Sequence, residues 1–522
     1  MNAPHLPSEP RIPTDARHST FQRRGFYLHG CWVMEHPFSV RSWQRQDFAA
    51  MSRLLHLLGF NAVMIWPTPE TAPMPLSEED AATLSGYRDV FDDAKANGLE
   101  CWLAYCPNVI SKDEVRHLPW KDRSLSASTQ VIRLSEEPKA AEAYLDHRCS
   151  VLGLLDNADA FVVIDGDPGG YAGAPPEEYL RILRSDQSAV PGKRVIPWIW
   201  NGWGRDSTGE EYWSTPVLPT VRASLEMLKN GMSGEWELLP GRSHREGWAN
   251  GRVPLAETER AGLMPRSTIF CYEAIEFEPS EPAAAIQFDL IRQALKQESQ
   301  FSSVAKGVFG NAQQPVMVLP NLYFFARGAA NSDYLEKTDS EVLTDFAREL
   351  GDAEGVLIPA WSCLKLSLRD LPADHAQKVR ALHLDTELAR SIPGGPRRYV
   401  EILAAQLESR RGLLAATAAP PATADQAATS LAAGAGALLR WWHVHRYVGA
   451  GKKGDPFQWR FLREDQVRQL WEYATHCAAF GPGMITRAAE ILASENLLPL
   501  DEASQRLSEL MSTAGSEFEK LH

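Results

Sequence analysis

The chain lacks the features that mark membrane, nucleic-acid-binding and disulfide-rich proteins. No apolar run approaches the ~18 residues of a membrane helix, so we expect no membrane partner. The net charge is −14 and there is no basic block, which argues against a nucleic acid partner. The seven cysteines are scattered and odd in number, so they predict reduced thiols and a cytoplasmic location.

The N-terminus shows no targeting signal, and the spacing of metal-binding residue types shows no cofactor site. Residues 1–20 are polar and proline-rich and have no apolar core of a signal peptide, so we expect a disordered lead. No His, Cys or Asp spacing is typical of a metal site, and Cys101 and Cys106 are too far apart for a CxxC pair. The sequence therefore predicts neither a metal nor a cofactor.

Strand-like and helix-like segments alternate from residue 21 to 330. The strand-like segments are 25–33, 60–67, 99–107, 160–167, 193–204, 234–241, 266–280 and 304–313. Helical patterns follow each one, beginning near Ser42, Ser77, residue 138, Pro175, residue 216, residue 254, Pro282 and residue 314. Eight strand–helix units predict an α/β protein of the (β/α)8 TIM-barrel class. The rival, a doubly wound sheet, usually has a GxGxxG turn after its first strand, and HGCWVMEHPF has none.

Residues 331–522 are rich in helical patterns and contain no clear strand, so we expect an α-helical C-terminal domain. The Ala-rich segment 412–437 contains a Pro pair and is expected to be a loop or helix break. His443 and His445 are two apart on an expected helix, so they face different ways and packing is the default interpretation. This region would either cover the mouth of the barrel or support a homodimer.

Barrel enzymes carry their active sites at the C-terminal ends of the strands. In this chain those ends gather acids, indoles and amides. They are His29, Trp32, Glu35, Trp66, Glu70, Tyr105, Asn108, Asp165, Asp167, Trp198, Trp200, Asn201, Trp203, Glu235, Trp236, Glu237, Tyr272, Glu273, Glu276, Glu278, Asn311 and Gln313. Such a rim suits a neutral sugar, because aromatic faces stack on the ring while amides and acids bond its hydroxyls.

Two acidic segments are the catalytic candidates. Asp165 and Asp167 end the fourth strand, while Glu276 and Glu278 follow the seventh, across the barrel. Crowded acids raise a pKa, and a protonated carboxyl facing a carboxylate is what glycoside hydrolysis needs. A second mechanism also fits, in which one Asp orients a substrate N-acetyl group that acts as the nucleophile. The alternative is that the two aspartates are turn and cap residues.

The other rim residues are candidates for substrate binding. We assign this role to His29, Trp32, Trp66, Tyr105, Trp198, Trp200, Asn201, Trp203, Tyr272, Glu273 and Asn311. His29 is equally compatible with a satisfied core histidine, Trp198 with packing, and Glu273 with a surface acid or a residue that orients the others. Glu235 and Glu237 are more often solvated than catalytic.

Residues 43–63 resemble a segment of known protein families. Trp43, Asp47, Met51 and the run Leu58-Gly59-Phe60-Asn61-Ala62-Val63 resemble the first helix and second strand of several glycoside hydrolase barrels. These are the α-N-acetylglucosaminidases, α-glucuronidases and β-hexosaminidases, and the first two also attach a largely helical C-terminal region. The Asp-Gly-Asp of 165–167 replaces the adjacent Asp-Glu pair that β-hexosaminidases carry, which argues against that family. The resemblance implies a glycosidase, without naming its sugar.

We therefore predict a disordered lead (1–20), a catalytic barrel (21–330) and a helical domain (331–522). The predicted reaction is hydrolysis of a short oligosaccharide or glycoside. One alternative is a sugar-acid lyase or isomerase, which would need a metal or a Lys base at a strand end. Lys306 lies early in its strand, away from the mouth. The other alternative is a carbohydrate-binding protein without catalysis, in which loss of Asp165 or Glu276 would leave ligand binding intact.

Overall fold

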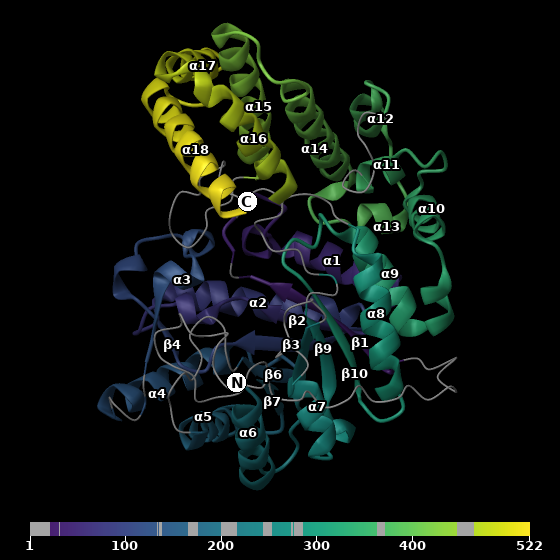
Figure 1. The fold of residues 1–522 in the computed structure, drawn as a ribbon. Coiled ribbons are helices and arrows are strands. Elements are labelled where there is room, and N and C mark those ends of the chain that lie inside the picture. Colours follow the sequence, from purple (N-terminus) through teal and green to yellow (C-terminus); the bar gives the residue numbers. More distant parts are fainter. Residues whose placement is uncertain are drawn as a thin grey trace, which may run out of the picture.

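The computed structural model describes residues 21–30, 32–132, 134, 138–164, 176–199, 217–243, 253–272, 275, 286–362, 371–445 and 464–521. Eight parallel strands in these ranges close into a barrel in the order β1-β10-β9-β8-β7-β6-β3-β2 (Figure 1). They are β1 (Arg23–His29), β2 (Ala62–Trp66), β3 (Glu100–Tyr105), β6 (Ala160–Ile164), β7 (Arg194–Ile199), β8 (Leu239–Ser243), β9 (Thr268–Tyr272) and β10 (Gly307–Ala312). The predicted (β/α)8 barrel is confirmed.

Helices follow the strands and cover the outside of the barrel, as a parallel sheet requires. They are α1 (Arg45–Leu58), α2 (Glu78–Ala96), α4 (Pro138–Leu154), α5 (Pro176–Ala189), α6 (Val217–Gly231), α7 (Val253–Arg260), α8 (Phe288–Glu298) and α9 (Leu319–Ala330). Figure 1 shows α8 and α9 on one side of the barrel and α4, α5 and α6 on the other. A small antiparallel pair, β4 (Val109–Ser111) and β5 (Thr129–Val131), was not predicted.

The first helix shows how local sequence sets the element boundaries. Gln44 caps α1 in a reciprocal capping box with Asp47, and Gly59 ends it with a left-handed φ of 101°. The next residue, Phe60, leads directly into β2. Because a helix that connects two parallel strands runs back along them, the start of α1 lies at the end of the barrel where β1 ends, which is the side of the mouth.

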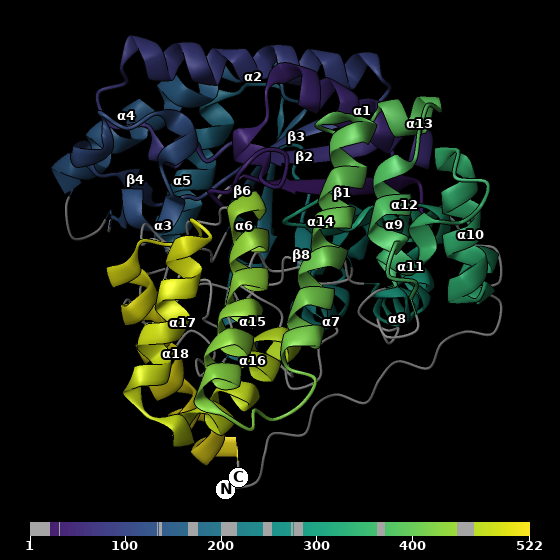
Figure 2. The same cartoon turned by 90° about the horizontal axis from the view of Figure 1, so that it is seen from above.

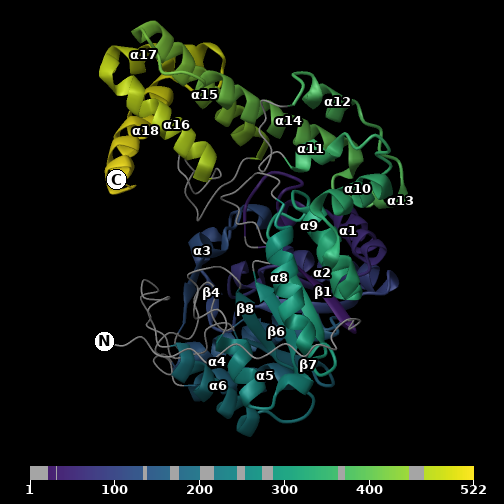
Figure 3. The same cartoon turned by 45° about the vertical axis from the view of Figure 1, so that its right-hand side comes forward.

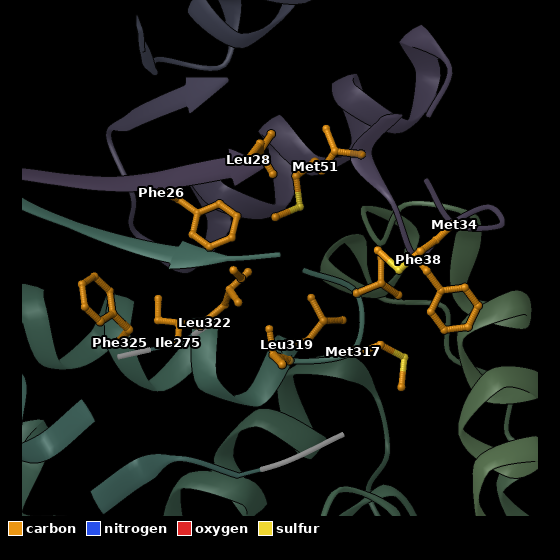
Figure 4. Packing of buried hydrophobic residues seen from close by; sticks show 14 of the residues in the cluster. Phe26, Leu28, Met34, Phe38, Met51, Ile275, Met317, Leu319, Leu322 and Phe325 are labelled. Atoms are coloured by element: carbon orange, nitrogen blue, oxygen red, sulfur yellow. The ribbon is translucent and has the colours of Figure 1, made fainter. Parts of the chain in front are cut away.

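Strand residues alternate between two cores. Alternate positions such as Tyr27 and Trp102 fill the barrel interior, and the others pack against the helices. The interior is filled so closely that a Cβ on Gly25 would lie 2.2 Å from the ring of Phe309. In Figure 4 the outward Phe26 of β1 lies toward Leu322 of α9, and the outward Leu28 lies beside Met51 of α1.

The sixth barrel strand begins later than its sequence suggests. The segment 234–241 alternates polar and apolar residues, but β8 runs over Leu239–Ser243, so Glu235, Trp236 and Glu237 precede it. They lie at the end of the barrel opposite the mouth, where Glu237 accepts bonds from Arg23 and Lys306 (both 2.8 Å). The expectation that these three residues belong to the mouth was wrong, because the alternation belongs to the segment that enters the strand.

A bundle of helices follows the barrel. After the short helices α10 (Asp339–Leu350), α11 (Leu357–Trp361), α12 (His375–Ala381) and α13 (Glu387–Arg390), the long ones are α14 (Gly395–Ala416), α15 (Ala424–His445), α16 (Glu464–Cys477), α17 (Pro482–Ser494) and α18 (Leu500–Leu521). Figure 2 shows α14 beside α15, and Figure 3 shows the bundle standing clear of the helices that surround the barrel. None of the described helices is both long enough and apolar enough to cross a membrane.

The Ala-rich segment 412–437 is mostly helix, and it contains the expected helix break. Only residues 417–423 break it, between α14 and α15. Alanine is the strongest helix former, and small residues let helices approach closely. A Cβ on Gly436 would lie 3.1 Å from Leu497, so this glycine marks a close contact between α15 and the segment after α17.

The end of α15 joins the bundle to the barrel. The Nε2 atom of His445 lies 2.9 Å from the side-chain oxygen of Gln314, just after β10. The backbone N–H of Glu35, after β1, donates to the carbonyl of His445 (3.1 Å). The ring of Phe38 packs edge-on to His445, with centroids 4.8 Å apart. The bundle therefore contacts two loops at the mouth.

Candidate active site at the mouth of the barrel

The described part of the mouth is built by the ends of four strands. His29 of β1 is paired in register with Trp66 of β2, and Tyr27 with Asn311 of β10. Trp198 reaches the same interior from β7. Parallel strands and strict alternation place these side chains on the inner face near the C-terminal edge.

Aromatic rings form one wall of the mouth. The ring of His29 stacks on Trp32, with centroids 6.2 Å apart, and meets Trp66 edge-on at 5.1 Å. Burial lowers the pKa of His29 to about 3. The imidazole is therefore neutral at neutral pH and contributes an apolar face and hydrogen-bonding nitrogens rather than a charge.

Trp198 lies deeper than a surface platform would. Its ring packs against Phe270 (centroids 4.2 Å apart) and Tyr27 (5.4 Å), and the residue is buried. Its indole Nε1 has no hydrogen-bond partner among the described residues. The residue thus serves packing, as the alternative interpretation held, while it still offers one donor to the interior.

Asn311 offers the complementary group. The residue is buried at the end of β10, and its Oδ1 has no hydrogen-bond partner in the described part of the chain. Buried polar atoms are nearly always paired in native proteins. The acceptor on Asn311 and the donor on Trp198 are therefore candidates for contact with a polar ligand at the mouth.

Glu70 is a buried acid at the end of β2 that the sequence placed on the rim without a role. The indole Nε1 of Trp66 donates to both of its oxygens (3.2 Å each), and the backbone N–H of Cys106 donates to Oε1. Burial raises the pKa of Glu70 to about 6, although these N–H groups and Arg148 act to lower it. The carboxyl joins the ends of β2 and β3 and fixes the ring of Trp66.

Tyr105 faces away from the barrel interior. Its hydroxyl donates to Asp186 of α5 (2.9 Å), and the guanidinium of Arg148 lies 4.3 Å from its ring centroid. Burial raises the pKa of Tyr105, so the hydroxyl keeps its proton. Alternation along β3 explains this position, because Ala104 and Cys106 occupy the inner face on either side.

Several candidates lie outside the described residues. The structure describes the backbone of Tyr272 in β9 but not its side chain. It describes neither the four proposed catalytic acids nor four of the proposed binding residues, which are Asp165, Asp167, Glu276, Glu278, Trp200, Asn201, Trp203 and Glu273. Their roles stay predictions.

Sequence reasoning missed the residues that act over long separations. Arg148 reaches the carbonyl of Cys106 (3.0 Å), and His445 reaches Gln314 across 131 residues of sequence. No sequence pattern signals either pair. In the described ranges, no cluster of three or more His, Cys, Asp or Glu side chains is arranged to hold a metal ion.

No protein-family model and no curated protein matches this chain. Solved structures do match, at low similarity. A mutant O-GlcNAc hydrolase of Thermobaculum terrenum is 12% identical and covers 92% of this chain and 98% of that chain, with a TM-score of 0.43. The protein CpGH84D is 11% identical and covers 95% and 70%, with a TM-score of 0.42.

A third match has the same character. A GH138 enzyme targeting pectin rhamnogalacturonan II is 12% identical and covers 95% of this chain and 62% of that one, with a TM-score of 0.41. These values transfer neither an activity nor any residue role to this chain.

Proposed function

We propose that this chain is a glycoside hydrolase that binds an uncharged sugar at the mouth of its barrel. One observation carries the proposal. A buried acceptor on Asn311 and a buried donor on Trp198 lack partners among the described residues, beside a wall formed by His29, Trp32 and Trp66. Sugar hydroxyls both donate and accept, and the apolar face of a sugar ring stacks on aromatic rings.

The neutral state of His29 also favours an uncharged substrate. A histidine whose pKa is about 3 adds no positive charge to the wall. The aromatic rings and the amide of Asn311 are likewise neutral. A sugar with hydroxyl or N-acetyl substituents fits this chemistry better than a phosphorylated one, which would call for arginine or lysine.

Two acidic segments follow strands of this barrel in the sequence. In the sequence, Asp165 follows directly after the last residue of β6. Glu276 follows Ile275, which is three residues beyond the end of β9. In the order of the closed barrel, β7 and β8 separate these two strands. Carboxyl groups from the two segments would face each other across the mouth, as a pair that flanks a glycosidic bond must.

The reaction would proceed by acid–base chemistry. A protonated carboxyl donates its proton to the glycosidic oxygen, the C–O bond breaks, and the electron pair stays on the leaving oxygen. The anomeric carbon forms its new bond with water that the base deprotonates, or with a nucleophile that water then displaces. We assign the acid or orienting role to Asp165 and Asp167. We assign the role of base or nucleophile to Glu276 and Glu278. An N-acetyl group of the substrate, oriented by one of the aspartates, is the second way to supply the nucleophile.

The test is hydrolysis of a panel of aryl glycosides and natural disaccharides by the whole chain, with and without a chelator. We expect release from one sugar, unchanged by the chelator, and a loss of about 10²-fold or more in Asp167→Ala and Glu276→Ala. Metal-dependent elimination or isomerisation would instead identify a sugar-acid lyase or isomerase. Sugar binding without turnover, retained in both variants, would identify a carbohydrate-binding protein.

A further inference from the structure

A pocket lies at the end of the barrel opposite the mouth, where four neighbouring strands begin. It has a volume of about 490 Å³. Its lining includes Arg194, the first residue of β7, and residues 234–237, which lie ahead of β8. Arg266 of η6 (Met264–Arg266) lies ahead of β9, and Lys306 lies ahead of β10. The pocket is therefore separate from the proposed sugar site.

Charged side chains close the barrel beside this pocket. Glu237 accepts bonds from Arg194 (2.7 Å) and Lys306 (2.8 Å). Arg23 donates to both Glu237 and Glu100 (2.8 Å each), and Arg194 also donates to Glu100. Burial acts to raise the pKa values of Glu100 and Glu237, but the surrounding cations outweigh it and lower both. Both carboxyls are therefore ionised, and three cations share their two negative charges.

Arg266 is a fourth cation, and it forms no ion pair within the described chain. Its guanidinium lies over the ring of Trp236, 4.4 Å from the centroid, and its Nη1 donates to the carbonyl of Trp236 (3.3 Å). Trp236 is buried, so these two contacts hold the guanidinium at the wall of the pocket. A guanidinium carries five N–H donors, so most of those on Arg266 remain for a ligand.

The pocket carries more positive than negative charge. The side chain of Lys306 is 40% exposed and uses one of its three donors on Glu237. The remaining acid of the lining, Glu235, is exposed and forms no ion pair within the described part of the chain. Even when its charge is counted, four cations stand against three carboxylates. Because the whole chain has a net charge of −14, this local excess is a distinct feature that favours an anion.

We propose that this pocket binds a phosphorylated small molecule. Its phosphate meets Arg266 and Lys306, because a guanidinium fork matches phosphate oxygens and a lysine supplies a point charge. The rest of the molecule lies along Gly234, Gly262 and Pro265. Sites for small molecules typically have about 300–1,000 Å³, so the pocket holds more than an isolated phosphate ion. The proposal does not depend on hydrolase activity, because the mouth lies at the other end of the barrel.

The test is phosphorus NMR of glucose 6-phosphate with the whole wild-type chain, with inorganic phosphate, glucose and glucuronate as competitors. We expect the ester to bind with a Kd of about 1 mM or lower. Inorganic phosphate should displace it, whereas glucose and glucuronate should not. An unbroadened phosphorus signal, or displacement by glucose but not by phosphate, would overturn the proposal. Equal displacement by glucuronate and phosphate would overturn the assignment to phosphate.

Charge-matched variants locate the site. Arg266→Gln and Lys306→Gln should each weaken the binding of glucose 6-phosphate by about tenfold. The controls Arg348→Gln on α10 and Lys296→Gln on α8 remove the same charge from exposed side chains outside the pocket and should keep the wild-type affinity. Because Arg266 forms no ion pair within the described chain, Arg266→Gln should keep the wild-type melting temperature. Equal affinities of Arg266→Gln and Arg348→Gln would contradict the assignment.

Discussion

His445 lies at the joint between the helical bundle and the barrel. His445 is buried, and its Nε2 is bonded to Gln314 while its ring packs on Phe38. His445→Ala removes a buried hydrogen bond, worth about 1–3 kcal/mol when a partner is left unsatisfied. It also removes an aromatic contact worth about 0.5–1.5 kcal/mol. We expect a total loss of about 3 kcal/mol at this joint.

The chain offers a matched control in the same helix. His443 is exposed, and its ring nitrogen bonds the carbonyl of Leu497 (3.0 Å) within the bundle. His443→Ala and His445→Ala replace the same residue type at two positions of the same helix, so their changes in helix propensity cancel. We expect His443→Ala to cost about 0.5 kcal/mol or less, as is usual for surface positions.

Amide hydrogen exchange reports the local opening of this joint. The N–H of Glu35 donates to the carbonyl of His445, so its protection depends on the docked helix. A loss of about 3 kcal/mol corresponds to exchange about two orders of magnitude faster in His445→Ala, with little change in His443→Ala. Equal exchange of the Glu35 amide in the two variants would refute the reasoning.

The pH dependence has a definite sign. Burial lowers the pKa of His445 to about 3, below its ordinary value of 6.5. The folded state thus requires the neutral ring, and its contribution is complete above pH 6.5 and lost as the pH falls below that value. Between pH 6.5 and 5 the loss is about 2 kcal/mol. The joint in His445→Gln, which does not titrate, should show no such loss.

Three further substitutions test the barrel. Gly25→Ala places a Cβ against Phe309 and should lower the free energy of unfolding by at least about 1–3 kcal/mol, measured by thermal unfolding. Its control is Gly86→Ala, whose Cβ meets open space in α2 and should be neutral or stabilising. Equal melting temperatures of the two variants would contradict the packing. Glu70→Gln removes a carboxyl whose folded pKa of about 6 makes the wild type lose about 2 kcal/mol in total as the pH rises from well below 4.5 to well above 6. The variant should therefore gain on the wild type over that range in chemical denaturation, and a constant difference would contradict the burial of the charge. Asn311→Ala should lower kcat/KM on the substrate found in the panel by about tenfold without changing the melting temperature, and an unchanged kcat/KM would remove Asn311 from the site.

Much of the barrel could be predicted because its signals are local. Apolar strand runs and helix signals such as Ser77 at the start of α2 and Gly59 after α1 gave the elements within a few residues. The segment before β8 misled because its alternation of polar and apolar residues continues ahead of the strand. Glu237 of that segment bonds Arg23 and Lys306 at the end of the barrel opposite the mouth, which only the closed structure reveals.

The candidate site was less predictable for a geometric reason. The sequence indicates which residues end a strand but not which face each one occupies, and a shift of one residue decides between the interior and the helices. Tyr105 faces Asp186 for this reason, whereas the neighbouring Cys106 faces the interior. Contacts such as that of His445 with Gln314 join distant segments and leave no local pattern.

The proposed hydrolysis requires acids at the mouth of the barrel. The most direct test is the rate of aryl glycoside hydrolysis by Asp165→Ala, Asp167→Ala, Glu276→Ala and Glu278→Ala. Glu235→Ala, an exposed acid at the opposite end of the barrel, is the control. The account predicts a loss of about 10²-fold or more in at least one variant of each segment, with the control at the wild-type rate. Wild-type rates in all four variants, or no hydrolysis by the wild type, would contradict it.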